Sequence, residues 1–336
     1  MAYTLEEIGK VLKGANRVVI FPHDNPDPDA IASAWGMQFL LKEAFNIKGR
    51  IVYGGFIGRA ENKAMVNFLK IKLSRLANIK LSKKDKFILI DTQPGVGNNS
   101  LPKGVIPSIV IDHHPLKRRQ KSILVDVRED VGACSTIVTE YLMKNGVEVP
   151  KNLATALFYG ISSETMGLFV ETENLDKECY KFLFPRISQF LLSKVQHPQH
   201  EREFFFYLKE ALENARIYRN VVLVDMGILD NADLISEFCS FFLSFNKATW
   251  ALSFGIVGDR LVFSIRTQNR RARAGRIAQR IVKGNGKAGG HGMSAGGWVK
   301  LEGKGRSEEL TRQLIGRFLK TLGHNCNVKL SLLIGD

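Results

Sequence analysis

The sequence predicts an α/β protein of two domains, with a parallel sheet in the N-terminal domain and a smaller α/β domain after it. In the first half, short apolar runs alternate with stretches of helical periodicity, a pattern typical of parallel strands that are covered on both faces. The segment 184–202 interrupts this alternation with two prolines, and a second series of strands and helices follows. The 336 residues are enough for two domains.

Each element of the N-terminal domain has its own pattern. Five short apolar runs predict buried strands, at residues 17–21, 50–54, 87–91, 108–112 and 123–127. Apolar residues at helical spacing predict helices, at residues 29–45, 134–146 and 152–162. The first 14 residues carry two glutamates and indicate an amphipathic helix rather than a signal peptide.

The second half is similarly divided. We predict, in chain order, a strand, a helix, a β-hairpin and a further helix, at residues 221–227, 231–245, 249–268 and 273–283. The hairpin turns at Gly258-Asp259, and the last helix leads into a glycine-rich loop. We assign residues 1–190 to the first domain, 191–215 to a linker and 216–336 to the second domain.

Composition limits the classes of partner and compartment. The net charge of +15 favours anionic partners, namely phosphates, nucleic acid or an anionic membrane surface. No run approaches the roughly 18 apolar residues of a membrane helix. The four cysteines form no CxxC pair, which is typical of reduced thiols in a cytoplasmic protein. We therefore expect a cytoplasmic protein without membrane attachment.

Acidic and imidazole side chains follow three of the predicted strands. His23, Asp27 and Asp29 follow the first strand, Asp91 ends the third, and residues 112–114 (Asp-His-His) end the fourth. The carboxyl ends of parallel strands meet at one edge of a sheet, where ligands bind. Mixed Asp and His ligands suit Mn²⁺, Mg²⁺, Fe²⁺ or Zn²⁺, with manganese favoured and magnesium an alternative. There are too many ligands for one tetrahedral ion, so we expect two ions about 3.5–4 Å apart.

Each of these residues also has a structural interpretation. A single Asp after a strand is more often a helix cap than a ligand, so Asp29 could cap the helix 30–45. Asp27 could form an Asx turn beside its neighbouring prolines. The metal interpretation is stronger because these residues all fall at the same end of successive strands.

Several segments resemble the motifs of the DHH phosphoesterases. HDNPDPDAIASAW, ILIDTQPG and VIDHHP resemble the first three motifs, and GACSTIVTEYL and YGISSETMGLF resemble the helix and fourth motif that follow. SIRTQ and GGHGMSAGGW resemble the DHH-associated C-terminal domain, whose glycine-rich segment contacts substrate. The motifs cover nearly the whole chain in the expected order, and the overall length is most similar to the nanoRNase/pAp-phosphatase branch.

The resemblance implies a role for each motif residue. The ligands of one ion would be His23, Asp27 and Asp91. The ligands of the second ion would be Asp29, Asp91, His113 and Glu164, so that Asp91 bridges. His114 would act in catalysis by facing the substrate phosphate. The family normally has aspartate at the position of Glu164, which is one methylene longer, so the geometry of that ligand differs from the family pattern.

Two metal ions would supply the chemistry. They lower the pKa of a bound water and neutralise the charge that develops on the phosphate, so no serine or cysteine nucleophile is needed. The C-terminal domain would bind substrate through Arg266, Gly289, Gly290 and His291. Eight basic residues and no acid lie between 266 and 287, and 116–121 (LKRRQK) is a second basic patch; solvated loops and helix faces are the alternative for both.

The predicted function is hydrolysis of a short oligonucleotide or nucleotide substrate. The enzyme would cleave short oligonucleotides to mononucleotides, or would hydrolyse 3′,5′-bisphosphonucleosides. The alternatives are a pyrophosphatase or exopolyphosphatase, a phosphodiesterase related to cyclic dinucleotides, and a nucleotide sensor without activity. The glycine-rich C-terminal motif argues against a pyrophosphatase. The sequence leaves the oligomeric state open, a homodimer included.

Overall fold

The computed structural model describes residues 3–15, 17–82, 84–116, 122–170, 172–282, 284, 286–301, 307–325 and 329–335. The chain divides into two compact units, Met1–Pro198 and Gln199–Asp336. The basic segment 117–121 lies outside the described residues, and with it most of the basic patch predicted there.

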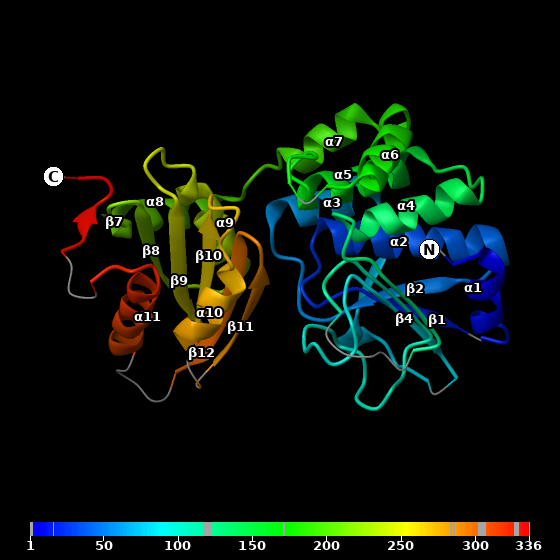
Figure 1. Cartoon of the computed structure of the whole chain (residues 1–336), viewed down its shortest axis with the longest axis horizontal. Coiled ribbons are helices and arrows are strands. Elements are labelled where there is room, and N and C mark those ends of the chain that lie inside the picture. Colours follow the sequence, from blue (N-terminus) through cyan, green and yellow to red (C-terminus); the bar gives the residue numbers. More distant parts are fainter. Residues whose placement is uncertain are drawn as a thin grey trace. The chain divides into compact units, whose positions relative to one another are not determined.

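The N-terminal unit contains a six-stranded parallel sheet in the order β3-β2-β1-β4-β5-β6 (Figure 1). Its strands are β1 (Val18–Phe21), β2 (Gly49–Tyr53), β3 (Leu73–Arg75), β4 (Lys86–Ile90), β5 (Ile109–Asp112) and β6 (Leu124–Val127). The predicted parallel sheet is confirmed. The strand order reverses between β1 and β4, and such a reversal opens a crevice at the carboxyl ends of the strands.

Helices cover one face of this sheet, as Figure 1 shows. The helices of this unit are α1 (Leu5–Leu12), α2 (Pro28–Phe45), α3 (Ala60–Leu69), α4 (Cys134–Lys144), α5 (Lys151–Glu164), α6 (Asn174–Leu183) and α7 (Gln189–Gln196). Helices α2 and α4 contact the strands, whereas α6 and α7 pack on other helices. The strands are buried on both faces, as predicted, but the helices lie on only one of them. Within the described residues, the connections from β3 to β6 contain only the short 3-10 helix η1 (Leu76–Asn78), so loop residues such as Leu81, Leu101 and Val105 cover the other face.

Helix α2 carries the first motif and is central to the unit. Asp27 is its N-cap and accepts a hydrogen bond from the Ala30 amide, and Pro28 occupies the first turn, where proline is favourable. The helix packs closely on α4 and α5 because its residues are small. A Cβ on Gly36 would lie 2.6 Å from Val138. The start of α2, and with it Asp27 and Asp29, is therefore fixed against the sheet.

The segment 184–202, which interrupts the predicted alternation, and the predicted linker 191–215 are both largely helical. Residues 184–202 contain the 3-10 helix η2 (Phe184–Arg186) and α7, and α8 (Arg202–Asn214) follows. The prolines mark helix ends here instead of irregular chain. Pro185 occupies the first turn of η2, and Pro198 follows α7. The division between the units falls after Pro198, inside the segment 191–215 that we assigned to the linker.

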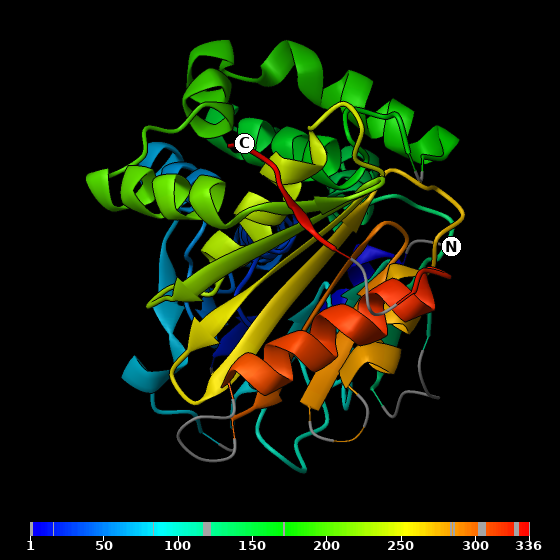
Figure 2. The same cartoon turned by 90° about the vertical axis from the view of Figure 1, so that its left-hand side faces the viewer.

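The C-terminal unit contains a seven-stranded mixed sheet in the order β11-β12-β10-β9-β8-β7-β13. Its strands are β7 (Arg216–Tyr218), β8 (Val221–Ile228), β9 (Trp250–Val257), β10 (Arg260–Thr267), β11 (Gly286–His291), β12 (Ser294–Lys300) and β13 (Ser331–Leu332). Among the described strand pairs of this sheet, only β8 and β9 are parallel, and the hairpin predicted at Gly258-Asp259 joins β9 to β10. Figure 2 shows the long strands of this sheet side by side.

Two helical layers cover opposite faces of this second sheet. Helices α10 (Ala274–Val282) and α11 (Ser307–Thr321) pack on the face that carries Leu261, Phe263 and Ile265. Helices α8 and α9 (Asp233–Leu243) pack on the other face, against residues such as Val222 and Val224. Within the described parts of both units, no helix has the length and apolarity that crossing a bilayer would require.

The glycine-rich segment forms a β-hairpin, so the prediction of a loop is wrong. Strands β11 and β12 pair through Gly289 and Gly296, and their backbone groups take part in the ladder. Gly290 has a φ of 148°, and a Cβ there would lie 2.3 Å from the Ser294 oxygen. A Cβ on Gly275 of α10 would lie 2.1 Å from the Gly290 oxygen. The glycines thus allow tight pairing and close contact between helix and strand.

Asp176 of α6 fixes the loop that starts α4. Its carboxylate accepts hydrogen bonds from the amides of Gly132 and Glu173 and from the hydroxyl of Thr136, at 2.5–3.1 Å. We expect Asp176→Asn to lower the free energy of unfolding by about 1–3 kcal/mol, because an amide leaves buried donors without an acceptor. Thermal melting measures the loss. An unchanged melting temperature would contradict this anchoring role.

Candidate metal centre

Three side chains meet at the carboxyl ends of β1 and β4. The Nε2 atom of His23 lies 3.3 Å from Oδ2 of Asp27 and 3.6 Å from Oδ2 of Asp91. One ligand atom from each of the three residues lies within 4.8 Å of the others, which is close enough to hold one metal ion. These are the residues that the family resemblance assigns to the first ion.

A second group of possible ligands shares Asp91. Its Oδ1 atom lies 3.5 Å from Nε2 of His113 and 3.5 Å from Nδ1 of His114, and the three residues again fit within 4.8 Å. One oxygen of Asp91 therefore faces each group. This position corresponds to the bridging role that we predict for Asp91.

The loop between β1 and α2 is held firmly behind the first group. The Asp24 carbonyl accepts a hydrogen bond from Nδ1 of His23 at 2.9 Å, which places the lone pair of the ring on Nε2. The Asp24 amide donates to the Asn98 carbonyl, and Ser100 donates to the Asp24 carboxylate. Gly54 allows this close packing, because a Cβ there would lie 2.1 Å from the Asp24 carboxylate.

Asp112 and Gln93 orient the second group. The sequence placed Asp112 at the end of a strand but indicated no role for it, and it did not indicate Gln93. The Asp112 carboxylate accepts hydrogen bonds from the amide of His113 at 2.9 Å and from Nδ1 of His114 at 2.9 Å. Gln93 donates to the other oxygen of Asp112 at 2.8 Å. The position of Asp112 in the DHH triplet was a usable signal, since carboxylates that orient a site histidine commonly lie beside it.

The electrostatics of the cluster indicate a site for cations. Burial raises the pKa of Asp91 well above its usual value, and the nearby charges of Asp29 and Asp27 raise it further. Burial alone would lower the pKa of His23, but the charge of Asp27 outweighs it and raises the pKa to about 9. Oδ1 of Asp91 is buried and accepts no hydrogen bond from any described residue. A divalent cation would both neutralise these acids and occupy this oxygen, so the residues fit a metal ion.

Asp29 has a structural contact that the sequence did not indicate. It does not cap its own helix. Its two oxygens accept hydrogen bonds from the amides of Cys134 and Ser135 at the start of α4, both at 2.7 Å. Burial and the charge of Asp27 nevertheless raise its pKa to about 6. Asp29 lies outside both groups of possible ligands, and its role as a ligand stays a prediction.

Glu164 is the last residue of α5 and belongs to the same electrostatic cluster. Burial raises its pKa well above the usual value, and the charges of Asp27 and Asp29 add to this effect. The positive charge of Arg59, which precedes α3, acts on the pKa of Glu164 in the opposite direction. Arg59 was not among the predicted site residues, since no motif surrounds it.

The predicted substrate residues lie in the C-terminal unit. Arg266 of β10 donates to the hydroxyl of Ser264 and the carbonyl of Ile265, both at 2.9 Å, and to Ser236 of α9 at 3.3 Å. Gly289 and His291 belong to β11, opposite Gly296 and Ser294 of β12. The structure therefore places the hairpin beside β10, with the Arg266 side chain on the face of the sheet that α9 covers.

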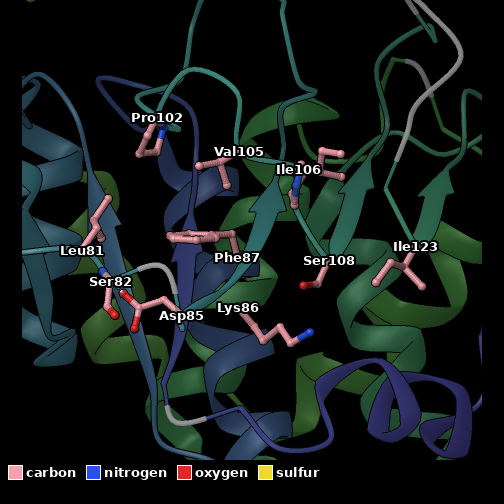
Figure 3. A pocket seen from close by; sticks show the side chains of 11 residues that line it. Leu81, Ser82, Asp85, Lys86, Phe87, Pro102, Val105, Ile106, Ser108 and Ile123 are labelled. Atoms are coloured by element: carbon pink, nitrogen blue, oxygen red, sulfur yellow. Dashed lines mark hydrogen bonds between the residues drawn. The ribbon is translucent and has the colours of Figure 1, made fainter.

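A cavity of about 650 Å³ lies elsewhere in the N-terminal unit (Figure 3). Phe87, Val105, Ile106 and Ile123 form much of its apolar lining. Phe87 follows the first residue of β4, whereas Asp91 follows the last, so the cavity lies at the amino ends of the strands. It is not part of the candidate metal centre.

Comparison with known proteins identifies the N-terminal unit. Residues 17–161 match the DHH family, N-terminal domain, and this range contains every residue of the two ligand groups. The N-terminal unit belongs to the DHH family. An exopolyphosphatase-related protein from Bacteroides fragilis has a similar crystal structure, with a TM-score of 0.73 over 94% of this chain and 95% of that one. At 16% identity this likeness shows a common fold, which extends over both units.

Two curated relatives have similar sequences. An uncharacterized protein from Methanocaldococcus jannaschii is 37% identical over 287 residues, which is 84% of this chain and 58% of that protein. A probable manganese-dependent inorganic pyrophosphatase from Streptococcus pyogenes is 29% identical over 155 residues, which is 46% of this chain and 50% of that protein. The chain thus spans little more than half the length of these relatives.

Proposed function

We propose that this DHH protein is a metal-dependent phosphoesterase that hydrolyses short oligonucleotides to mononucleotides, or 3′,5′-bisphosphonucleosides. The observation that carries the proposal is the position of Asp91, whose two oxygens face two separate groups of ligand side chains. Two divalent ions side by side are the usual catalysts of in-line displacement at phosphorus. The manganese dependence in the name of the Streptococcus relative favours manganese.

In this mechanism, His23, Asp27 and Asp91 would hold one ion. Asp91 and His113, with Asp29 and Glu164 as further candidates, would hold the second. The ions would supply a water of lowered pKa and would neutralise charge on the phosphate. Asp112 accepts a hydrogen bond from His114 and, against the effect of burial, raises its pKa. A protonated His114 would bind a phosphate oxygen of the substrate.

The substrate class rests on the charge of the chain and on the C-terminal hairpin. The net charge of +15 favours a polyanion, and glycine strands permit close approach of a ligand to the backbone. Pyrophosphate or polyphosphate is the second candidate, and the names of two similar proteins favour it. All these substrates are hydrolysed at phosphorus. They differ in the group attached to the phosphate, which the protein must recognise.

Metal removal tests the reaction type, and a substrate panel tests the specificity. We expect EDTA to abolish turnover and manganese to restore it, because the acids of the centre can bind phosphate only through a cation. The panel contains a labelled RNA trinucleotide, a linear dinucleotide, adenosine 3′,5′-bisphosphate, pyrophosphate and a short polyphosphate. Full activity in excess EDTA would exclude the two-metal mechanism. Preferred release of phosphate from pyrophosphate or polyphosphate would replace the nucleotide proposal.

Arg266 tests whether the C-terminal unit binds substrate. We expect Arg266→Gln to leave the metal content intact and to lower kcat/KM for a trinucleotide. The corresponding loss of transition-state stabilisation should be about 1.5–3 kcal/mol, the range for a charge-assisted hydrogen bond. The effect should be smaller for bis-p-nitrophenyl phosphate, which lacks a nucleoside. Because Arg266 also contacts Ser264 and Ser236, melting temperatures must accompany the kinetics. Equal effects on both substrates, with a lower melting temperature, would indicate a structural role only.

A further inference from the structure

Helix α10 presents a row of arginines on the side that faces away from its sheet. Ala274, Gly275, Ala278, Ile281 and Val282 form its buried side. The exposed side carries Arg276 and Arg280, and the residues just before the helix add the exposed Arg270, Arg271 and Arg273. We call these five residues the α10 arginines.

The α10 arginines have no acidic counterpart nearby in the sequence. No aspartate or glutamate occurs between Arg260 and Leu301. Among the described residues, none of the five guanidinium groups lies within ion-pair distance of a carboxylate. An ordinary solvated helix face mixes both signs of charge, so this face has an unbalanced positive field.

Helix stability does not explain this arrangement. The N-terminus of a helix carries a partial positive charge, so basic residues there are unfavourable and acidic ones are preferred. Arg273 immediately precedes α10 and Arg276 lies in its first turn, which contains no acid. Only Arg280, in the last turn, is favourably placed. Residues that oppose the local preference point to a function.

The α10 arginines are also separate from the predicted substrate residue Arg266. Helix α10 packs on the sheet face formed by Leu261, Phe263 and Ile265. Arg266 contacts Ser236 of α9, which covers the opposite face. Arg266 and helix α10, although close in the sequence, therefore lie on opposite faces of the β-sheet.

We propose that the α10 arginines bind the phosphodiester backbone of a nucleic-acid strand, at a surface on the opposite face of the C-terminal sheet from Arg266. Arg273, Arg276 and Arg280 have i, i+3, i+7 spacing and span about 10 Å along the helix, enough to contact successive phosphates. Guanidinium groups bind phosphate oxygens bidentately, which favours arginine over lysine. No large apolar side chain is exposed between Arg260 and Leu301 in the described residues, which argues against a membrane surface.

Binding of RNA to the α10 arginines can be measured in EDTA without turnover, so its outcome is independent of the proposed hydrolytic function. The full-length chain is titrated into a labelled 12-nucleotide RNA, and fluorescence anisotropy is recorded from 50 to 400 mM NaCl. The triple variant R273Q/R276Q/R280Q is expected to bind about tenfold or more weakly at low salt. Its salt slope should decrease by about one for each phosphate that the variant no longer binds. A parallel titration with a 12-base-pair duplex shows whether the α10 arginines prefer single-stranded or double-stranded nucleic acid.

A matched control removes the same charge elsewhere in the unit. R202Q/K209Q/K247Q replaces three exposed basic residues outside α10, and we expect less than a twofold change in affinity. Equal decreases in affinity for the two triple variants would mean that only net charge attracts RNA, and would overturn the proposal. Competition by polyglutamate at the same charge concentration as RNA would also overturn it, in favour of an acidic protein partner.

A single charge reversal separates binding from folding. Arg276→Glu places an acid in the first turn of α10, where it is favourable to the helix dipole. We expect a melting temperature equal to or above that of the parent chain, together with weaker RNA binding. Hydrolysis of bis-p-nitrophenyl phosphate with manganese should be unchanged in this variant and in R273Q/R276Q/R280Q. RNA affinity that stays at the parental value in a folded Arg276→Glu variant would overturn the proposal.

Discussion

Asp91→Asn should lower turnover by about a thousandfold or more, corresponding to about 4 kcal/mol in the activation barrier. Asp91 is the only residue that contributes to both ligand groups among the described residues, and an amide removes the charge that would bridge two cations. Asparagine is the appropriate replacement because Asp91 has a φ of 58°, a conformation that asparagine tolerates well. Metal analysis should show loss of both ions, and activity should not return at high manganese.

The same variant should be more stable than the parent chain when both are free of metal. Burial and neighbouring carboxylates raise the pKa of Asp91, so its charge opposes folding in the absence of a cation. Asp176→Asn is the matched control, because that buried carboxylate is fully hydrogen-bonded and its loss should lower the melting temperature. A lower melting temperature for Asp91→Asn in EDTA, or normal metal content, would contradict the assigned role.

Asp112→Asn should lower kcat by about 10- to 100-fold, the usual effect of losing a residue that orients a site histidine. An amide would keep one acceptor for the backbone but would place a donor opposite Gln93 or His114. The alkaline limb of the pH–rate profile should move to lower pH. Asp112 raises the pKa of His114, so its removal lets His114 lose its proton at a lower pH. Metal content at saturating manganese should remain close to normal.

A double-mutant cycle shows whether Asp112 acts through His114. If it does, Asp112→Asn should have little further effect on kcat in an H114A background. Additive effects, or an unchanged pH profile in the single variant, would mean that Asp112 supports the loop in general and does not position His114. Thermal melting of all three variants excludes unfolding as the cause.

The sequence predicted most of the elements that surround the centre. Nearly continuous apolar runs predicted the bounds of β1, β2, β4, β5 and β6 within one residue. Such runs are a clear signal because strands buried on both faces must be apolar throughout. The one-sided helical cover could not be predicted, because long polar loops such as 92–107 protect a sheet face without any periodic signal. Proline likewise marks both helix starts and irregular chain, so the prolines of the segment 184–202 did not indicate the helices found there.

The centre itself was predictable as a set of residues at strand ends, but its contacts were not. The sequence order placed His23, Asp27 and Asp91 at one edge of the sheet, and the structure brings them together. The partner of Asp29 lies more than 100 residues away at the start of α4, so no local pattern indicates this hydrogen bond. The sequence also could not show that Arg266 and helix α10 lie on opposite faces of the β-sheet. Residues close together in the sequence can face opposite sides of a sheet, so this arrangement became visible only in the structure.

The strand order of the N-terminal sheet has a consequence for how the chain acquires its metal. β1 pairs with β4, so His23 and Asp91 meet only when these two strands have paired, and α2, β2, α3 and β3 lie between them in the sequence. His113 joins them only when β5 has been added to β4. If these residues hold metal as proposed, a chain that lacks β4 or β5 would have only part of the ligand set. Mass action then stabilises the whole unit, by about 2.7 kcal/mol when free metal is a hundredfold above its dissociation constant.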